Sequence, residues 1–466
     1  MKSSSGLYRL IYEYYEARIL YGYYVRGDHL PSISKLCGMF HLAPATVRAG
    51  LKALEKKGYI RVDARRASLV VYEAESTDFR RNAAEYFVPR KAEIMDLLQT
   101  GGLVFDSLWK EGMYRWSEEE WDTLRRGLAA PGSGDVSMPV QLYIQALKAL
   151  DNGLIVNLYW EIVRDLCFPY LGNQEGRRRT ARALPGASKD EIILFLQQEM
   201  ETMQAAVSEA LCAFIDRAAG EYGLEPVKQV SFRWNIYRQR PQMRYTLCSR
   251  VIREIAEGLY PEGGYLPSLP QMAEMYGVGV NTVRRTLEIL SGLGLVRSYH
   301  GKGTQVCTEQ RDIEFTKPEI QEGLRLYRES LQFLALTIGN VVRYTLESAS
   351  LKERARLRQC LSGLIGSGRS FLGIERILTF IEAQCPSMFV RECYGRIREL
   401  MAWGYPLALL HQRDGSLHRE YLGTAARLAQ DLEEGREEEF AATCRRLLLW
   451  EEARLGKYGL RDCWSE

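Results

Sequence analysis

The side chains best suited to chemistry in this chain are polar and cationic groups gathered at the start of one segment. Four of them stand within five positions: Asn281, Thr282, Arg284 and Arg285. Apolar residues among and after them, Val283, Leu287 and Leu290, keep helical spacing and mark the inner face of a helix. The polar side chains are left on the outer face, where such donors hydrogen-bond to phosphate oxygens and base edges of nucleic acid. We therefore expect a DNA contact at this helix.

The elements around this helix have the pattern of a helix-turn-helix. An amphipathic helix is expected at Thr246–Glu257, and Ser268 is a cap residue for a short helix that ends at Tyr276. Gly277 supplies the turn before the helix Asn281–Leu290. In a pair of this kind the second helix lies in the major groove with its N-terminal polar residues at the DNA. Ser268 joins the four polar side chains as a candidate contact.

A hairpin is expected directly after this helix. The segments Val296–Tyr299 and Thr304–Cys307 favour a pair of strands around a glycine-permitted turn. Glycines allow the backbone to approach phosphates closely, and cationic side chains at such a tip can reach a minor groove. The candidate DNA contacts of this wing are His300, Gly301, Lys302 and Gly303.

A second copy of the same pattern stands 236 residues earlier in the chain. Leu30-Pro31-Ser32 recurs as Leu266-Pro267-Ser268, and Thr46-Val47-Arg48 recurs as Thr282-Val283-Arg284, without a gap. The candidate contacts of this copy are Ser32, Thr46, Arg48, Arg65 and Arg66. Its last two arginines occupy the positions of the wing glycines, so the function of the first copy stays open.

Helical periodicity without strand alternation follows each copy, as in the runs Ile192–Ala218 and Arg419–Leu455. The prediction is a mainly α chain in which two winged helix-turn-helix domains, each with three helices and a small β-hairpin wing, alternate with two all-α helical bundles. We expect the winged domains at residues 1–74 and 241–309. The bundles are expected at residues 75–240 and 310–466.

At Leu-Pro-Ser, Thr-Val-Arg and the Gly-x-Gly turn, the chain resembles the GntR family of bacterial transcription regulators. The resemblance implies duplex DNA as partner and a cytoplasmic regulator. Both copies depart from the family, because Ser34 and Pro270 replace an arginine that usually follows Leu-Pro-Ser. The Ser-Arg pair that usually opens the recognition helix is also replaced, by Ala43-Pro44 and Gly279-Val280. Since arginine to guanine is the commonest base-specific contact, a different operator preference is expected.

The helical regions resemble the family's effector domain of the fatty-acid-regulator type. That resemblance implies control by a small-molecule effector. In this domain type an aspartate and three histidines often hold a metal, but only His418 falls near such a position here. A single imidazole is not a metal site, so we expect no metal and no cofactor.

Composition agrees with a soluble regulator that is not exported. The net charge of +3 is uneven, since residues 1–72 hold 12 Lys and Arg against five Asp and Glu. The ten cysteines are scattered, which favours reduced thiols in a cytosol. The most apolar stretch, Leu331–Val342, is too short to span a bilayer, so no membrane partner is expected.

Three functions compete for this pattern. The leading hypothesis is a sequence-specific DNA-binding transcription regulator controlled by an effector or by assembly through its helical domains. The alternative is an interaction or sensor protein whose DNA binding has degenerated, which the missing arginines favour. An enzyme is excluded, because a fused pyridoxal-phosphate domain would need strand–helix alternation and a Schiff-base lysine. The duplication predicts a pseudo-symmetric monomer, with a homodimer as the other assembly.

Overall fold

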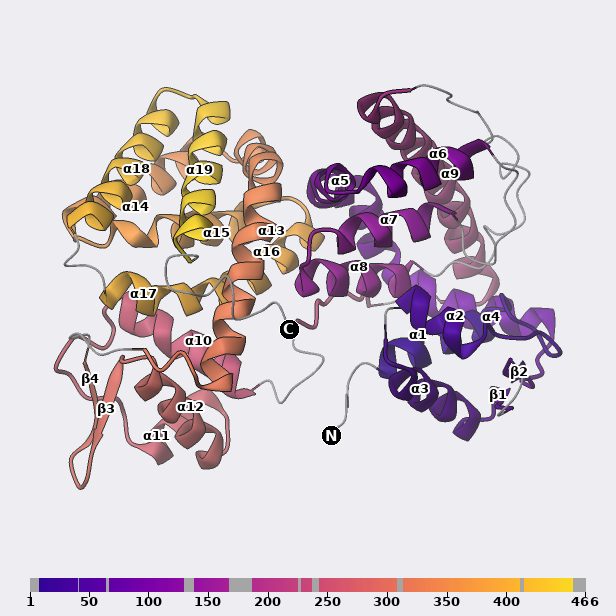
Figure 1. The fold of residues 1–466 in the computed structure, drawn as a ribbon, viewed down its shortest axis with the longest axis horizontal. Coiled ribbons are helices and arrows are strands. Elements are labelled where there is room, and N and C mark those ends of the chain that lie inside the picture. Colours follow the sequence, from indigo (N-terminus) through magenta and orange to yellow (C-terminus); the bar gives the residue numbers. More distant parts are fainter. Residues whose placement is uncertain are drawn as a thin grey trace. The chain divides into compact units, whose positions relative to one another are not determined.

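The computed structural model describes residues 8–40, 42–63, 67–129, 138–166, 187–224, 228–236, 243–307, 313–410 and 415–455. The chain divides into two compact units, Met1–Arg240 and Pro241–Glu466. Each unit begins with a small domain of three helices and a hairpin and continues as helices (Figure 1). The mainly α prediction is therefore confirmed. No helix of the described residues is long and apolar enough to cross a membrane.

The two winged domains have corresponding elements at the offset seen in the sequence. The first contains α1 (Tyr8–Leu20), α2 (Ile33–Phe40), α3 (Pro44–Lys56), β1 (Ile60–Arg61) and β2 (Leu69–Val70). The second contains α10 (Met243–Ala256), α11 (Leu269–Tyr276), α12 (Val280–Gly292), β3 (Val296–Tyr299) and β4 (Gly303–Val306). Both hairpins are antiparallel, with Ile60 opposite Val70 and Val296 opposite Val306. The expected strands and short helices of the second domain are confirmed.

Left-handed glycines make the same turns in both winged domains. Gly22 and Gly258 have φ values of 77° and 80°, and Gly58 and Gly294 have 80° and 75°. Only glycine adopts such angles without strain, so the matched positions keep the chain reversals of both copies alike. Gly277, the predicted turn between α11 and α12, also has a positive φ of 64°.

The helical part of the first unit contains α4 (Ser76–Phe87), η1 (Val88–Arg90), α5 (Lys91–Tyr114), α6 (Glu118–Ala129), α7 (Met138–Lys148), α8 (Gly153–Asp165) and α9 (Lys189–Glu221). That of the second contains α13 (Pro318–Ser348), α14 (Leu351–Gly366), η4 (Ser370–Leu372), α15 (Gly373–Gln384), α16 (Met388–Met401), η5 (Ala402–Gly404), α17 (Tyr405–Leu410), α18 (Gly415–Glu433) and α19 (Glu437–Leu455). The run Arg419–Leu455 is two helices, because the chain turns at Gly435, whose φ is 67°.

Arg164 on α8 attaches the first winged domain to its helical neighbours. Its Nη1 lies 3.0 Å from Glu13 Oε2 of α1 and 2.8 Å from Glu161 Oε2, while its Nε lies 2.9 Å from Asp165 Oδ1. Apolar packing accompanies the ion pairs, since Phe40 stacks on Trp160 with ring centroids 4.5 Å apart. Ion pairing thus fixes α1 to α8, and aromatic stacking fixes α2 to the same helix.

A further carboxylate near this cluster is poorly solvated. Glu93 on α5 is buried, and its Oε2 has no hydrogen-bond partner among the described residues. Burial, with the negative charge of Asp165 nearby, raises the pKa of Glu93 to about 7, while Arg90 and Arg164 oppose the shift. Ionisation of this carboxyl group therefore lowers the free energy of unfolding of the first unit.

We predict that Glu93→Gln stabilises the first unit at pH 8 by about 1–3 kcal/mol, since it removes a buried charge. The folded state binds this proton more tightly than the unfolded state, so stability falls as pH rises from about 4.5 to about 7. The gain should therefore shrink toward pH 5. Calorimetric unfolding at both pH values measures it. Glu85→Gln, at an exposed position on α4, is the control, and an equal gain at both pH values would contradict the explanation.

Candidate nucleic-acid interface

Helix α12 presents its polar residues as the apolar spacing predicts. Val283, Leu287 and Leu290 are buried. Asn281, Arg284 and Arg285 are exposed, and Thr282 is half-buried. The hydroxyl of Thr286, one turn further along, donates to the carbonyl of Thr282 at 2.9 Å. The outer face at the start of α12 therefore carries one amide and two guanidinium groups.

Arg284 and Asn281 form a pair on this face. Arg284 Nη1 donates to Asn281 Oδ1 at 3.0 Å, across one helical turn. Because the acceptor is a neutral amide and not a carboxylate, this hydrogen bond orients the guanidinium and leaves its positive charge unneutralised. Among the described residues, no ion pair involves Arg284, Arg285 or Lys302. An oriented, unneutralised arginine of this kind can bind a phosphate or the edge of a guanine.

Ser268 has a structural role at the start of α11. Its backbone N–H donates to Gln271 Oε1 at 2.9 Å, and its Oγ donates to the same oxygen at 2.7 Å, which completes a capping box. The residue is exposed. Its contact with DNA stays a prediction, because capping alone accounts for a serine at this position.

The wing of the second domain is exposed at its tip. His300, Gly301, Lys302 and Gly303 are all accessible, and Gly301 and Gly303 have φ values of 73° and 102°. A Cβ atom on Gly301 would meet nothing within 4 Å, so this glycine is required by the turn and not by crowding. The tip therefore offers a cation and open backbone on a tightly turned hairpin.

Two side chains of this wing were missed in the sequence. Arg297 lies with its guanidinium carbon 5.8 Å from the centroid of the Tyr299 ring, and both residues are exposed on β3. The signal was available, because residues two apart on a strand share a face. Tyr265, exposed and paired with Gln305 of β4, is a further aromatic group beside the hairpin. Arg297 adds a second cation to the wing.

The structure describes three of the residues predicted to contact DNA in the first winged domain. Arg48 is exposed on α3, and Ser32 is exposed with its Oγ accepting from the N–H of Lys35 at 3.3 Å. Arg65 and Arg66 lie outside the described residues. Thr46 is only 4% exposed, which corrects the expectation that its side chain is presented to DNA.

A glycine explains the different position of the two threonines. Thr46 lies one turn before Gly50, and a Cβ at Gly50 would come 2.6 Å from Cβ of Ile11 on α1. The absence of a side chain therefore lets α3 pack closely on α1 and cover the face that Thr46 shares. In the second domain the corresponding residue is Thr286, which is larger, and Thr282 stays half-exposed.

Buried ion pairs attach the second winged domain to its helices. Arg253 Nε of α10 lies 3.2 Å from Glu375 Oε1, and Arg398 Nη1 lies 2.7 Å from the same oxygen. The hydroxyl of Tyr405 donates to Glu375 Oε2 at 2.6 Å. At the end of α10, Arg369 Nη1 donates to the carbonyl of Glu257 at 2.6 Å. Helix α10 packs on α12, so these contacts position the candidate recognition helix.

No group of three or more metal-ligating side chains occurs within the described ranges. His418 is exposed on α18.

A family model matches both winged domains of the chain. The model of a family described as bacterial regulatory proteins, gntR family, matches residues 7–70 and 246–306. An uncharacterized HTH-type transcriptional regulator of Mycobacterium tuberculosis is 33% identical over 102 residues, which span 22% of this chain and 40% of that protein.

Two solved structures are also similar to part of the chain. A putative transcriptional regulator GntR from Rhodococcus sp. RHA1 is 18% identical, covering 46% of this chain and 98% of its own, with a TM-score of 0.26. A GntR protein of Streptococcus agalactiae is 16% identical, covering 46% of this chain and 99% of its own, with a TM-score of 0.21.

Proposed function

Because its two winged domains belong to the gntR family of bacterial regulatory proteins, we propose that this chain is a transcription regulator that binds duplex DNA. The observation that carries the proposal is the oriented Arg284–Asn281 pair on the exposed start of α12, beside a wing whose tip holds Lys302. In this proposal the chain recognises DNA and does not catalyse a reaction. It acts in the cytoplasm, where bacterial DNA is found.

Each winged domain is proposed to insert its recognition helix into a major groove. In the second domain Thr282, Arg284 and Arg285 meet bases and phosphates, while the wing tip follows the adjoining backbone. Asn281 orients Arg284 for this contact, and Arg297 supports the wing. In the first domain Arg48 is the corresponding cation. Without the arginines at positions 34, 44, 270 and 280, the preferred sequence differs from the family's usual operator.

We assign four domains to the chain. Residues 1–74 and 241–309 form the winged domains, and residues 75–240 and 310–466 form helical domains that control them through a small molecule or through assembly. The proposal is supported by the ion pairs that join the first helix of each winged domain to the helical domain that follows it. Arg164 makes this contact in the first unit and Glu375 in the second.

A second function has one observation in its favour. The burial of Thr46 removes a polar contact from the first recognition helix, as expected if this domain mediates interactions and has lost DNA binding. A salt titration separates the two functions, because phosphate contacts release counterions and make affinity fall steeply with salt concentration.

We predict that Arg284→Ala weakens duplex binding by about 1–3 kcal/mol if the guanidinium meets a base, and by less if it meets only phosphate. Arg284→Lys, which keeps the charge and loses the fork, should lie between the parent and the alanine variant. Fluorescence anisotropy at fixed salt measures the change, on DNA selected from a random library. Arg356→Ala, at an exposed position of α14, controls for net charge. Equal affinities of the parent and Arg284→Ala would remove α12 from the interface.

We also predict that one chain occupies two unequal half-sites about one helical turn apart, since it carries both DNA-binding modules that two chains would otherwise supply. The linkage raises the effective concentration of the second module to about millimolar. Light scattering should give one chain per DNA duplex, and footprints should lose different halves in Arg48→Ala and Arg284→Ala. An obligate dimer that protects the same bases through two copies of α12 would show that the first module is not used.

A further inference from the structure

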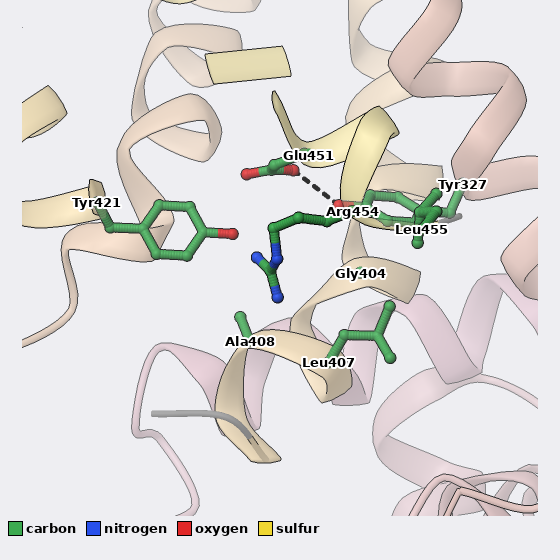
Figure 2. A pocket seen from close by; sticks show the side chains of 8 residues that line it. All are labelled: Tyr327, Gly404, Leu407, Ala408, Tyr421, Glu451, Arg454 and Leu455. Atoms are coloured by element: carbon green, nitrogen blue, oxygen red, sulfur yellow. Dashed lines mark hydrogen bonds between the residues drawn. The ribbon is translucent and has the colours of Figure 1, made fainter. Parts of the chain in front are cut away.

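Polar side chains in the helical part of the second unit bind one another. Glu451 of α19 is buried, Tyr327 donates to its Oε2 at 2.7 Å, and Tyr421 is a second hydrogen-bond partner (Figure 2). These contacts have a structural role, because they join α13 and α18 to α19, on which both helices pack. The apolar side chains at the starts of α3 and α12 are different, because they are exposed.

Val280 is the first residue of α12 and is 38% exposed. It shares a helix face with Arg284, which lies four positions later, and it directly precedes Asn281. Helix stability does not explain a valine here, because a β-branched residue is a weaker helix former than alanine and an exposed one buries little apolar surface. The start of α12 therefore presents an apolar group beside the guanidinium that Asn281 orients.

The start of α3 has the same character. Pro44 has the position that Val280 has in the second copy. The exposed apolar residues of this helix include Pro44, Ala45 and Ala49, and the exposed cation among them is Arg48. A protein partner would meet only small apolar groups here, interrupted by a positive charge. Duplex DNA offers phosphates to the charge and an apolar base atom to the small groups, so it is the better match.

The base edges of the major groove contain one kind of apolar group, the C5 methyl of thymine, among hydrogen-bond donors and acceptors. An apolar side chain placed against a donor or an acceptor removes water from it and supplies no hydrogen bond, which is unfavourable. Placed against a methyl group, the same side chain excludes water from apolar surface on both partners. Val280 is therefore suited to a pyrimidine with a C5 methyl group, as Arg284 is to guanine.

We propose that both recognition helices recognise the C5 methyl group of a pyrimidine, through Val280 on α12 and through Pro44 and Ala45 on α3. This inference rests on the proposed function, and it assigns to these apolar residues a base selectivity that the absent arginines would otherwise supply. Cβ atoms four residues apart on a helix are separated by about 5–6 Å, and successive base pairs by about 3.4 Å. The methyl group therefore lies roughly one or two base pairs from the base that Arg284 contacts. Thymine and 5-methylcytosine both carry this group.

Base analogues test the methyl group with the full chain. In a duplex selected from a random library, each thymine is replaced in turn by deoxyuridine, which lacks only the C5 methyl group. Replacement at a contacted position should weaken binding about fourfold, the effect of one buried methyl group. A cytosine at that position should bind more tightly when it is 5-methylated. A response to only one of the two changes would identify thymine or 5-methylcytosine as the natural source, and a response to neither would overturn the proposal.

Variants of Val280 assign the methyl contact to a side chain. Val280→Ala should remove the response to deoxyuridine in the half-site bound by α12, and it should keep the fold, because alanine is the better helix former. Val280→Arg should move the preference at that position to guanine. The control is Leu259→Ala, which truncates another apolar side chain, 65% exposed after α10, and should respond as the parent does. A response that persists unchanged in Val280→Ala would overturn this contact.

The first recognition helix is tested in the same way. The double change of Pro44→Ser with Ala45→Ser replaces the apolar groups by hydroxyls. We expect it to remove the response to deoxyuridine in the other half-site and to leave that of the half-site bound by α12. A duplex with only one methyl-dependent half-site, or an unchanged response in the double variant, would overturn the assignment to α3.

The salt dependence of binding distinguishes this inference from the function on which it rests. Salt-dependent duplex binding without any response to the C5 methyl group would overturn the inference and leave the regulator. A chain that binds no duplex at low salt would overturn the proposed function, and the inference with it. With both present, Val280→Ala should change the response to deoxyuridine without changing the slope of affinity with salt, because a valine neutralises no phosphate. A changed slope would show that the substitution disturbs the phosphate contacts and would overturn a purely apolar role for Val280.

Discussion

The attachment of the first helix of each winged domain to its helical neighbours is the constraint on which the rest of the structure depends. In the second unit a single buried carboxylate, Glu375, forms ion pairs with Arg253 and Arg398 and accepts a hydrogen bond from Tyr405. Removing any one partner leaves a charge or hydroxyl unsatisfied in a poorly hydrated place, so the geometry is narrowly defined. Since α10 packs on α12, the orientation of the recognition helix follows from it. The wing follows in turn, because β3 begins directly after α12.

The two units keep one backbone plan and differ in the side chains that use it. Gly22 and Gly258 make the same left-handed turn after α1 and α10. A Cβ would come 2.9 Å from the Phe79 ring at the first and 2.1 Å from Arg369 Nη2 at the second. The same glycine thus admits an aromatic ring in one unit and, in the other, a guanidinium that binds the carbonyl end of α10. The turn is shared, and the interaction that it permits is not.

Much of the fold could be predicted because its signals are local. Helical spacing predicted the inner face of α12, and the cap residue Ser268 with the turn at Gly277 predicted the limits of α11. Thr46 could not be placed in this way, since its burial depends on how closely α3 approaches α1 at Gly50. The motif Thr-Val-Arg is identical in both copies, yet the residue four positions later decides whether its threonine is accessible. A motif match therefore does not establish a contact.

The ionic attachments and the Tyr327–Glu451 hydrogen bond could not be predicted from the sequence, for a related reason. Arg253 and Glu375, like Tyr327 and Glu451, are far apart in the sequence, and nothing in their local spacing joins them. Which residues become partners depends on which helices pack together. The two helical regions have the same helical spacing of apolar residues but no common sequence motif. Periodicity tells which face of a helix is buried. It does not tell which buried polar residue meets which, so the polar contacts inside these bundles needed the structure.

The charge balance of the two attachments has also diverged. In the first unit Arg164 forms ion pairs with three carboxylates. One oxygen of the nearby Glu93 has no hydrogen-bond partner among the described residues. In the second, Glu375 is served by two arginines, and Arg398 also pairs with Glu382. Burial and the nearby Asp165 raise the pKa of Glu93 to about 7, so this carboxyl group beside the first attachment gains or loses a proton near neutral pH. At the second attachment the buried carboxylate is balanced by two guanidinium groups, so the loss of either ion pair would leave a buried charge with less compensation.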